Sequence, residues 1–219
     1  MRSAILGICV LFLVHNSQCQ VISSALPSPV YKSAKYLFYL HGAIVQEQGP
    51  NAISKDFGPY KYQDILDTLK SKGFYVISEV RPKETEAEDY GTKIKNQVDS
   101  LLHAGVSPSH ITIVGASAGA HIAVNAAIKL KNPKLNFVVI GMCWPETYKD
   151  YSSKELCGNF LSIYETSDPR GSCEKVFQQK NCDGKFKEVV TNTGKSHGFL
   201  YLPYKDWVEP LVDFANGKN

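Results

Sequence analysis

Short apolar runs alternate with segments of helical periodicity along most of the chain. The apolar runs predict buried strands over 35–40, 74–80, 110–114, 135–142, 160–164 and 186–191. Between and after them, apolar side chains recur at helical spacing over 60–72, 88–104, 118–130, 172–178 and 204–215. Residues 20–34 are rich in Ser and Pro and show no period, so we expect an extended lead-in there.

This alternation predicts an α/β fold. Strands that alternate with helices form parallel sheets joined by crossover helices. Near-continuous apolar runs such as FVVIG are typical of strands buried on both faces. We therefore expect a mostly parallel, doubly wound sheet of about six strands with helices on both faces. In such sheets the chemistry gathers beyond the carboxyl ends of the strands.

The first residues are expected to form a signal peptide rather than part of the fold. A basic second residue precedes the apolar run 4–14, which is too short to span a bilayer comfortably. Small side chains at Ser17 and Cys19 suit the positions that a signal peptidase reads, which places the cut before Gln20. A lipoprotein would instead be acylated on Cys19, but Gln18 is larger than the residue such sites favour.

Composition and charge narrow the class of protein. Of the 219 residues, 43% are hydrophobic and 21% are charged, as in an average folded domain. The net charge is only +3, and the lysines are interleaved with acids, which argues against a nucleic-acid partner. No second apolar segment is long enough for a stable membrane span.

Four cysteines remain after the signal peptide: Cys143, Cys157, Cys173 and Cys182. An even number in an exported chain favours disulfides, for which three pairings exist. The two local pairs, Cys143 with Cys157 and Cys173 with Cys182, each close a short loop at little cost in chain entropy. A metal site is not indicated, because no cysteine pair has the two-residue spacing of zinc ligands and no histidine is close by.

The segment Gly115–Gly119 reads Gly-Ala-Ser-Ala-Gly, at the junction between an expected strand and an expected helix. In the pattern Gly-x-Ser-x-Gly a sharp, strained turn lifts the serine off the strand end, and its neighbours must be small. The helix that follows directs free N–H groups and its positive dipole end at the reacting oxygen. Ser117 is therefore the candidate nucleophile. The alternative is a turn of small residues that packs helix on strand.

With this motif the sequence resembles the α/β-hydrolase superfamily of serine esterases and lipases. The resemblance covers nearly the whole mature chain, and it is strongest at GASAG and in the order serine, acid, histidine. It implies the α/β-hydrolase fold. The segment between Met142 and Phe160 is short, so we expect no large cap domain.

A serine hydroxyl needs a base to take its proton. The resemblance implies a histidine on the loop after the final strand, and of the six histidines only His197 lies there, in GKSHGF. Glycines on both sides suit a loop that carries an imidazole to a serine. We expect His103 and His110 to be structural, and His121 to pack or hydrogen-bond one turn beyond Ser117.

The base in turn needs a carboxylate that holds its tautomer and stabilises the imidazolium. The resemblance implies an acid after the penultimate strand, where the sequence reads YETSDPR. We favour Asp168, which lies in the loop and is stiffened by Pro169. Glu165, nearer the strand, and Asp183, further on, are the alternatives.

The developing oxyanion needs preorganised N–H donors. One is expected from Ala118, directly after the nucleophile. The resemblance implies a second from the loop that begins His41-Gly42-Ala43, with Ala43 as the donor. The stretch 46–62 that follows either lines an acyl pocket or is an ordinary surface loop.

These residues together predict a secreted or periplasmic ester hydrolase, with residues 1–19 as signal peptide and 20–219 as a single catalytic domain. We expect a small-molecule ester as its partner, no cofactor and no metal, and leave the oligomeric state open. An amidase or peptidase with the same triad, a lyase of the hydroxynitrile type and a non-catalytic binding protein are the alternatives. Dehalogenases and epoxide hydrolases are excluded because they need Asp at the position of Ser117.

Overall fold

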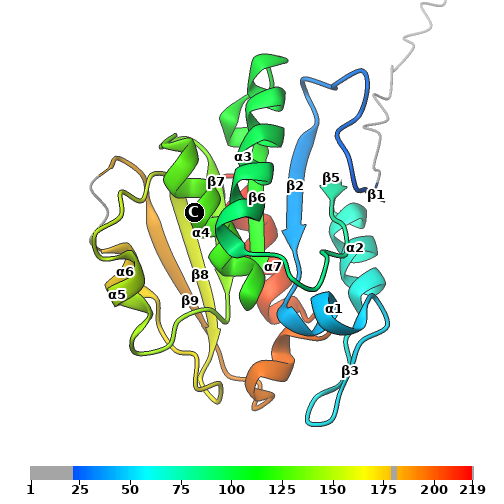
Figure 1. Ribbon diagram of the computed structural model, residues 1–219, viewed down its shortest axis with the longest axis vertical. Helices are drawn as coiled ribbons and strands as arrows, with labels where there is room; N and C mark the ends of the chain where they lie inside the picture. Colours follow the sequence, from blue (N-terminus) through cyan, green and yellow to red (C-terminus); the bar gives the residue numbers. More distant parts are fainter. Residues whose placement is uncertain (1–21, 179–181, 219) are drawn as a thin grey trace, which may run out of the picture.

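The computed structural model describes residues 22–178 and 182–218, and its centre is a seven-stranded sheet (Figure 1). All its neighbouring strands run parallel, in the order β1-β5-β2-β6-β7-β8-β9. The strands are β1 (Ile22–Ser23), β2 (Lys35–Leu40), β5 (Phe74–Ile77), β6 (Ile111–Ala116), β7 (Asn136–Ile140), β8 (Asn159–Glu165) and β9 (Phe186–Thr191). The signal peptide expected over 1–19 lies outside the described residues.

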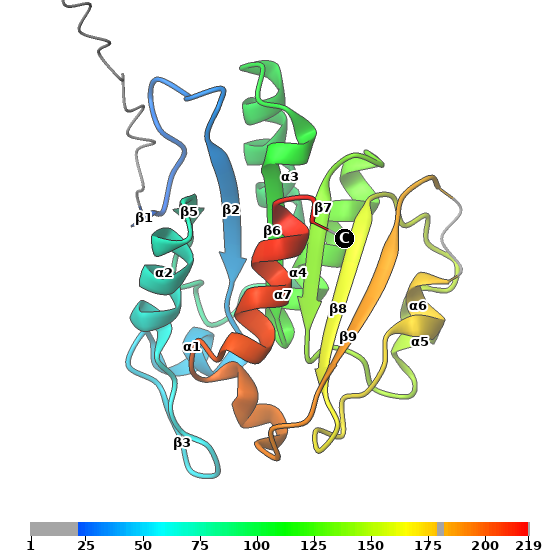
Figure 2. The ribbon, with the colours of Figure 1, turned by 180° about the vertical axis from the view of Figure 1, so that it is seen from behind.

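Helices cover both faces of this sheet, as expected (Figures 1 and 2). Helices α3 (Ala87–His103) and α4 (Ala118–Leu130) pack on one face, and α2 (Tyr62–Ser71) and α7 (Lys205–Ala215) on the other. The shorter helices are α1 (Ala43–Gln48), α5 (Thr147–Tyr151), α6 (Glu174–Phe177), and the 3₁₀ turns η1 (Pro108–His110) and η2 (Ser196–Leu200). Among the described residues, no helix is both long and apolar enough to cross a membrane.

Side-chain alternation along the strands explains why two separate cores form. In β2, the side chains of Tyr36, Phe38 and Leu40 enter the core under α3 and α4. Those of Leu37 and Tyr39 enter the core under α2 and α7. A central strand therefore needs apolar residues at every position, which is why it reads as an uninterrupted apolar run.

Two short features depart from the expected elements. Strand β1 lies inside the segment that we expected to be an extended lead-in, and it adds a seventh strand beside β5. The stretch 46–62 contains the small antiparallel pair β3 (Ile53–Ser54) and β4 (Gly58–Pro59). Strands of two residues are too short to show a period, so the sequence pattern cannot reveal them.

The disulfide pairing that we favoured from loop length is wrong. The bonds join Cys143 to Cys173 and Cys157 to Cys182. Cys143 and Cys173 follow the neighbouring parallel strands β7 and β8, whereas Cys157 and Cys182 precede the neighbouring strands β8 and β9. Like ends of adjacent parallel strands lie side by side, so sheet topology and not chain separation decides which cysteines meet.

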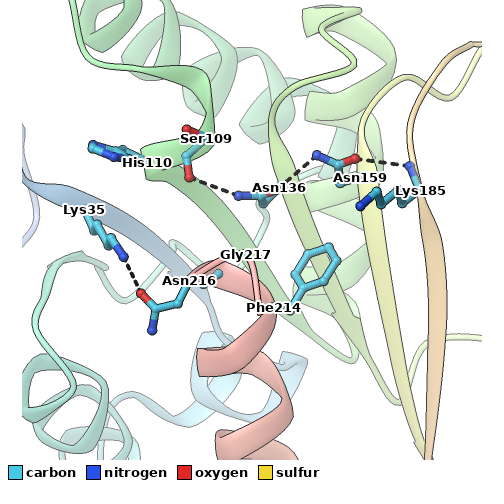
Figure 3. A pocket seen from close by; sticks show the side chains of 10 residues that line it. Lys35, Ser109, His110, Asn136, Asn159, Lys185, Phe214, Asn216 and Gly217 are labelled. Carbon is cyan, nitrogen blue, oxygen red and sulfur yellow. Dashed lines mark hydrogen bonds between the residues drawn. The ribbon is translucent and has the colours of Figure 1, made fainter. Parts of the chain in front are cut away.

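At the amino edge of the sheet, asparagine side chains link the starts of four strands (Figure 3). The amide of Asn136 donates to the carbonyl of Ser109 at 3.3 Å, and that of Asn159 donates to Asn136 Oδ1 at 3.2 Å. Asn159 Oδ1 then accepts the N–H of Lys185 at 3.1 Å. They border a polar cavity of about 370 Å³ whose amide groups already have partners, so we assign this edge a structural role.

Candidate active site

Ser117 occupies a strained turn between β6 and α4. Its backbone lies at φ 52° and ψ −118°, where non-glycine residues are rare. The two glycines of the motif allow the turn to close. A Cβ at Gly115 would lie 2.3 Å from the carbonyl oxygen of Gly119, and one at Gly119 would lie 2.0 Å from that of Leu40. Both positions therefore require glycine because a strand and a helix meet there at backbone contact.

His197 lies between Ser117 and Asp168. Its Nε2 is 3.0 Å from Ser117 Oγ, and its Nδ1 is 2.5 Å from Asp168 Oδ2. His197 belongs to η2, which follows β9 after a short loop, and its side chain is 14% exposed. The Asp168 side chain comes from the loop after β8 and is fully buried. With Nδ1–H donated to the carboxylate, Nε2 is left to accept the serine proton.

The second oxygen of Asp168 also has partners. Oδ1 accepts the backbone N–H of Arg170 at 3.1 Å, in a local turn that the aspartate makes with its own chain. The guanidinium of Arg170 lies 3.7 Å from the same oxygen, beyond hydrogen-bond distance. The turn fixes the carboxylate so that Oδ2 stays directed at the imidazole.

Glu165, the alternative acid, has partners other than His197. Its carboxylate, in a fully buried residue, accepts hydrogen bonds from Thr191, Thr193, Gly194 and Ser167. Burial alone would raise the pKa of this carboxyl, but the hydrogen bonds outweigh it and hold the pKa at about 2. Glu165 thereby ties the loop that carries Asp168 to the loop that carries His197.

The other alternative, Asp183, lies at the opposite edge of the sheet. It follows Cys182 and precedes β9, so it belongs to the amino edge, whereas Ser117 lies beyond the carboxyl end of β6. His121 is likewise outside the cluster. Its Nδ1 is 2.8 Å from the hydroxyl of Tyr151, in keeping with our expectation that it packs or hydrogen-bonds.

Two helix N-termini face the nucleophile. Ala118 is the first residue of α4 and Ala43 the first of α1, and the first N–H groups of a helix have no acceptor within it. Gly42, Ala43 and Ser117 line one cavity. A Cβ at Gly42 would lie 3.5 Å from that of Ser117, so the turn before α1 lies directly against the nucleophile.

His41 fixes this turn from behind. Its ring is fully buried, with Nδ1 2.9 Å from the carbonyl of Gly42 and Nε2 accepting the backbone N–H of Arg81 at 3.1 Å. Burial, reinforced by the nearby Arg81 cation, lowers the pKa of His41 to about 4. The ring is therefore neutral at pH 7 and holds the start of α1 as a structural hydrogen-bonding group.

Comparison with known proteins identifies structures of similar fold. No family model and no curated protein matches the sequence. Among solved structures, the Francisella virulence factor BioJ matches with a TM-score of 0.55 at 12% identity, over 85% of this chain and 78% of its own. A structure from a study of two fungal esterases of Rhizomucor miehei matches with a TM-score of 0.55 at 15% identity, over 89% and 75%. A predicted CIB-like hydrolase from Thermoplasma acidophilum gives 0.52 at 15% identity, over 85% and 89%.

The chain has the α/β-hydrolase fold. In this α/β-hydrolase fold Ser117 lines a cavity of about 190 Å³. The cavity is lined by Gly42, Ala43, Ile44, Tyr60, Ser117, Arg170, His197, Leu200 and Tyr201. Within residues 22–178 and 182–218, no cluster of three metal-ligating side chains forms.

Five lining residues were not singled out from the sequence: Ile44, Tyr60, Arg170, Leu200 and Tyr201. Tyr60 belongs to the stretch 46–62 for which we weighed an acyl pocket, and its hydroxyl is 2.7 Å from that of Tyr39. Burial raises the pKa of Tyr60, so its hydroxyl stays neutral. Leu200 and Tyr201 follow His197 by three and four residues, and this closeness in sequence could have indicated that they line the cavity. Arg170 lay two residues from Asp168, but nothing in the sequence showed that it reaches the cavity.

Proposed function

We propose that the protein is a serine hydrolase that cleaves carboxylic esters through an acyl-enzyme on Ser117. The observation that carries the proposal is the placement of His197, with one ring nitrogen on the serine hydroxyl and the other on the buried Asp168 carboxylate. A nucleophile, a base and an orienting acid in this order are what acyl transfer requires.

The reaction follows from these positions. Ser117 Oγ attacks the ester carbonyl as His197 Nε2 takes its proton, and the N–H groups of Ala118 and Ala43 stabilise the resulting oxyanion. Collapse of the tetrahedral intermediate breaks the ester C–O bond, and His197 returns the proton to the leaving alcohol. Water, deprotonated by the same imidazole, then hydrolyses the acyl-enzyme and regenerates Ser117. Asp168 orients the imidazole and stabilises the imidazolium.

The size of the cavity fits a small substrate, and the disulfides fit a location outside the cytoplasm. The cavity of about 190 Å³ has room for a short acyl group and is lined partly by the apolar side chains of Ile44, Leu200 and Tyr201. Two disulfides are compatible with an extracellular protein. We therefore propose that a single catalytic domain, residues 20–219, acts on small-molecule esters in a secreted or periplasmic location.

The test compares Ser117→Ala with Ser109→Ala, which changes an exposed serine at the opposite edge of the sheet. The two variants are assayed for hydrolysis of p-nitrophenyl acetate and for labelling by a fluorophosphonate. Ser117→Ala is expected to lose about a millionfold in turnover and all labelling, because the three residues act as a unit. Ser109→Ala is expected to keep both. Labelling that persists in Ser117→Ala overturns the proposal.

A further inference from the structure

Among the described residues, Arg170 brings a cationic side chain to the cavity beside the nucleophile. It lines the same cavity as Ser117 and His197, and its side chain is 24% exposed. None of the described residues that line this cavity is acidic. An arginine opening into an otherwise small and partly apolar pocket is a recognition group for an anion.

The position of Arg170 is fixed by the chain around it. Cys143 forms an antiparallel bridge with Gly171, which sets Trp144 opposite Arg170, and the Gly171 N–H donates to the Cys143 carbonyl at 2.9 Å. A disulfide from Cys143 to Cys173 closes the same corner. The guanidinium lies 4.5 Å from the centre of the Trp144 ring, as in a cation–π contact. Binding an anion would therefore require little further ordering of this side chain.

The donors of Arg170 are still available. Its nearest acid, Asp168, is 3.7 Å away, and that carboxylate already accepts from His197 and from the Arg170 backbone. Within the described part of the chain, the side-chain N–H groups of Arg170 make no hydrogen bond to protein. A substrate carboxylate would supply the acceptor that the fold does not.

We propose that Arg170 is a specificity-determining residue that selects esters carrying a carboxylate within a few bonds of the scissile carbonyl. This inference rests on the proposed ester hydrolysis at Ser117. The carboxylate belongs to the acyl part or to the alcohol part of the ester, and the guanidinium binds it through charge-assisted hydrogen bonds. Such bonds change affinity by on the order of 10- to 100-fold.

The competing role for Arg170 is to act only through Asp168, by helping to hold that carboxylate in place beside His197. In that case its loss would slow charged and neutral esters alike. The ratio of kcat/KM for a charged ester to that for a neutral ester of the same shape separates the two roles, because a change in the triad cancels from it.

The experiment uses two matched pairs of esters, followed by titration of released acid at constant pH. Monoethyl succinate and ethyl 4-methylpentanoate differ only at the end of the acyl chain, where an isopropyl group replaces the carboxylate. Carboxyphenyl acetate and isopropylphenyl acetate differ in the same way on the alcohol side. The wild-type protein is expected to prefer the charged member of at least one pair, and the pair that shows the preference identifies the side on which the anion binds.

Arg170→Gln is expected to lower the charged-to-neutral ratio of that pair by on the order of 10- to 100-fold, mainly through KM. Arg170→Lys should restore part of it, since lysine keeps the charge but not the planar fork. Lys195→Gln, which removes an exposed cation stacked on Tyr204 near His197, controls for long-range charge and should keep the ratio.

The outcomes separate this inference from the proposed function. Equal rates on charged and neutral esters in the wild type, or an unchanged ratio in Arg170→Gln, overturn the role of Arg170 and leave ester hydrolysis standing. A fall of the ratio in Lys195→Gln as large as in Arg170→Gln also overturns it. Absence of all Ser117-dependent hydrolysis overturns the proposed function, and the inference falls with it.

Discussion

Two buried carboxylates three residues apart at the end of β8 have different hydrogen-bond partners. Glu165 is the last residue of the strand, and its carboxylate accepts from the β9 end and the loop that follows. Asp168 lies beyond the strand, and a turn through the Arg170 N–H directs it at His197. Glu165 holds the two loops together, while Asp168 alone contacts the imidazole.

These environments predict different effects on catalysis. Asp168→Asn should cut turnover by about ten-thousandfold, because an amide can stabilise the wrong imidazole tautomer, as the same change does in a serine protease. Glu165→Gln should lose much less, since its carboxylate does not contact His197. Steady-state hydrolysis of p-nitrophenyl acetate by folded samples, with exposed Asp183→Asn as a control, measures both. If Glu165→Gln were the more damaging change, the acid would be wrongly assigned.

The depressed pKa of Glu165 also predicts a dependence of stability on pH. Its pKa is about 2 in the folded protein against an ordinary value of 4.5. The folded state therefore favours the carboxylate, and this stabilisation is complete above about pH 4.5 and is lost as the pH falls toward 2. Glu165→Gln should lower the free energy of unfolding most near neutral pH.

Urea unfolding at pH 7 and at pH 3 tests this dependence. The difference between wild type and Glu165→Gln should be smaller at pH 3 than at pH 7. Exposed Glu84→Gln should change the unfolding free energy little at either pH. A Glu165→Gln difference that grows on acidification would contradict the hydrogen-bonded carboxylate.

At the scale of the elements, the Gly-x-Ser-x-Gly motif located the junction of β6 and α4, although β6 continues to Ala116 and not only to Val114 as the pattern indicated. Helix α4 and strands β2 and β9 have the bounds that the pattern predicts, because turn residues such as Gly, Ser or Asn flank each of them. Strand β1 and helices α1 and α5 were not predicted. Each has six residues or fewer, so packing against neighbours and not its own periodicity forms it.

The close contact at this junction predicts an intolerance to added volume. Gly119→Ala would place a methyl 2.0 Å from the carbonyl oxygen of Leu40, so β2 and α4 must move apart. We expect a loss of at least about 1–3 kcal/mol in the free energy of unfolding, the usual cost of overpacking. Gly171→Ala is the matched control, because nothing lies within 4 Å of its Cβ position. Equal urea midpoints for the two variants would contradict the packing described.

At the scale of the whole molecule, the candidate catalytic residues and the structural asparagines lie at opposite edges of the parallel sheet. Ser117, Asp168 and His197 lie together at the carboxyl edge of the sheet. The hydrogen-bonded side chains of Asn136 and Asn159 lie at the amino edge (Figure 3). The hydrophobic pattern allowed the sheet and its helical layers to be predicted. The Gly-x-Ser-x-Gly motif and the resemblance to the α/β-hydrolases indicated Ser117, Asp168 and His197 as candidates. The sequence did not reveal the disulfide partners or the approach of Arg170, which depend on which strands lie side by side.

The size of the cavity predicts which acyl chains the enzyme prefers. About 190 Å³ around Ser117 holds a short acyl group, and Ile44, from α1, forms part of its wall. Each methylene that is buried gains about 0.8 kcal/mol, or roughly fourfold in kcat/KM, until the wall is reached. For neutral p-nitrophenyl esters, kcat/KM should therefore peak between acetate and hexanoate and then fall.

Ile44→Ala supplies the internal test of this limit. Removing this side chain enlarges the cavity, so the acyl-chain length with the highest kcat/KM should increase. Acetate should be hydrolysed no faster. In the structure, the stretch 46–62 forms the end of α1, the β3–β4 pair and Tyr60. The competing possibility is that this stretch closes over a long acyl chain. If it did, kcat/KM would rise steadily from acetate to palmitate in the wild type, and Ile44→Ala would not shift an optimum. A peak at short chains that moves in Ile44→Ala is the result that the geometry of the cavity requires.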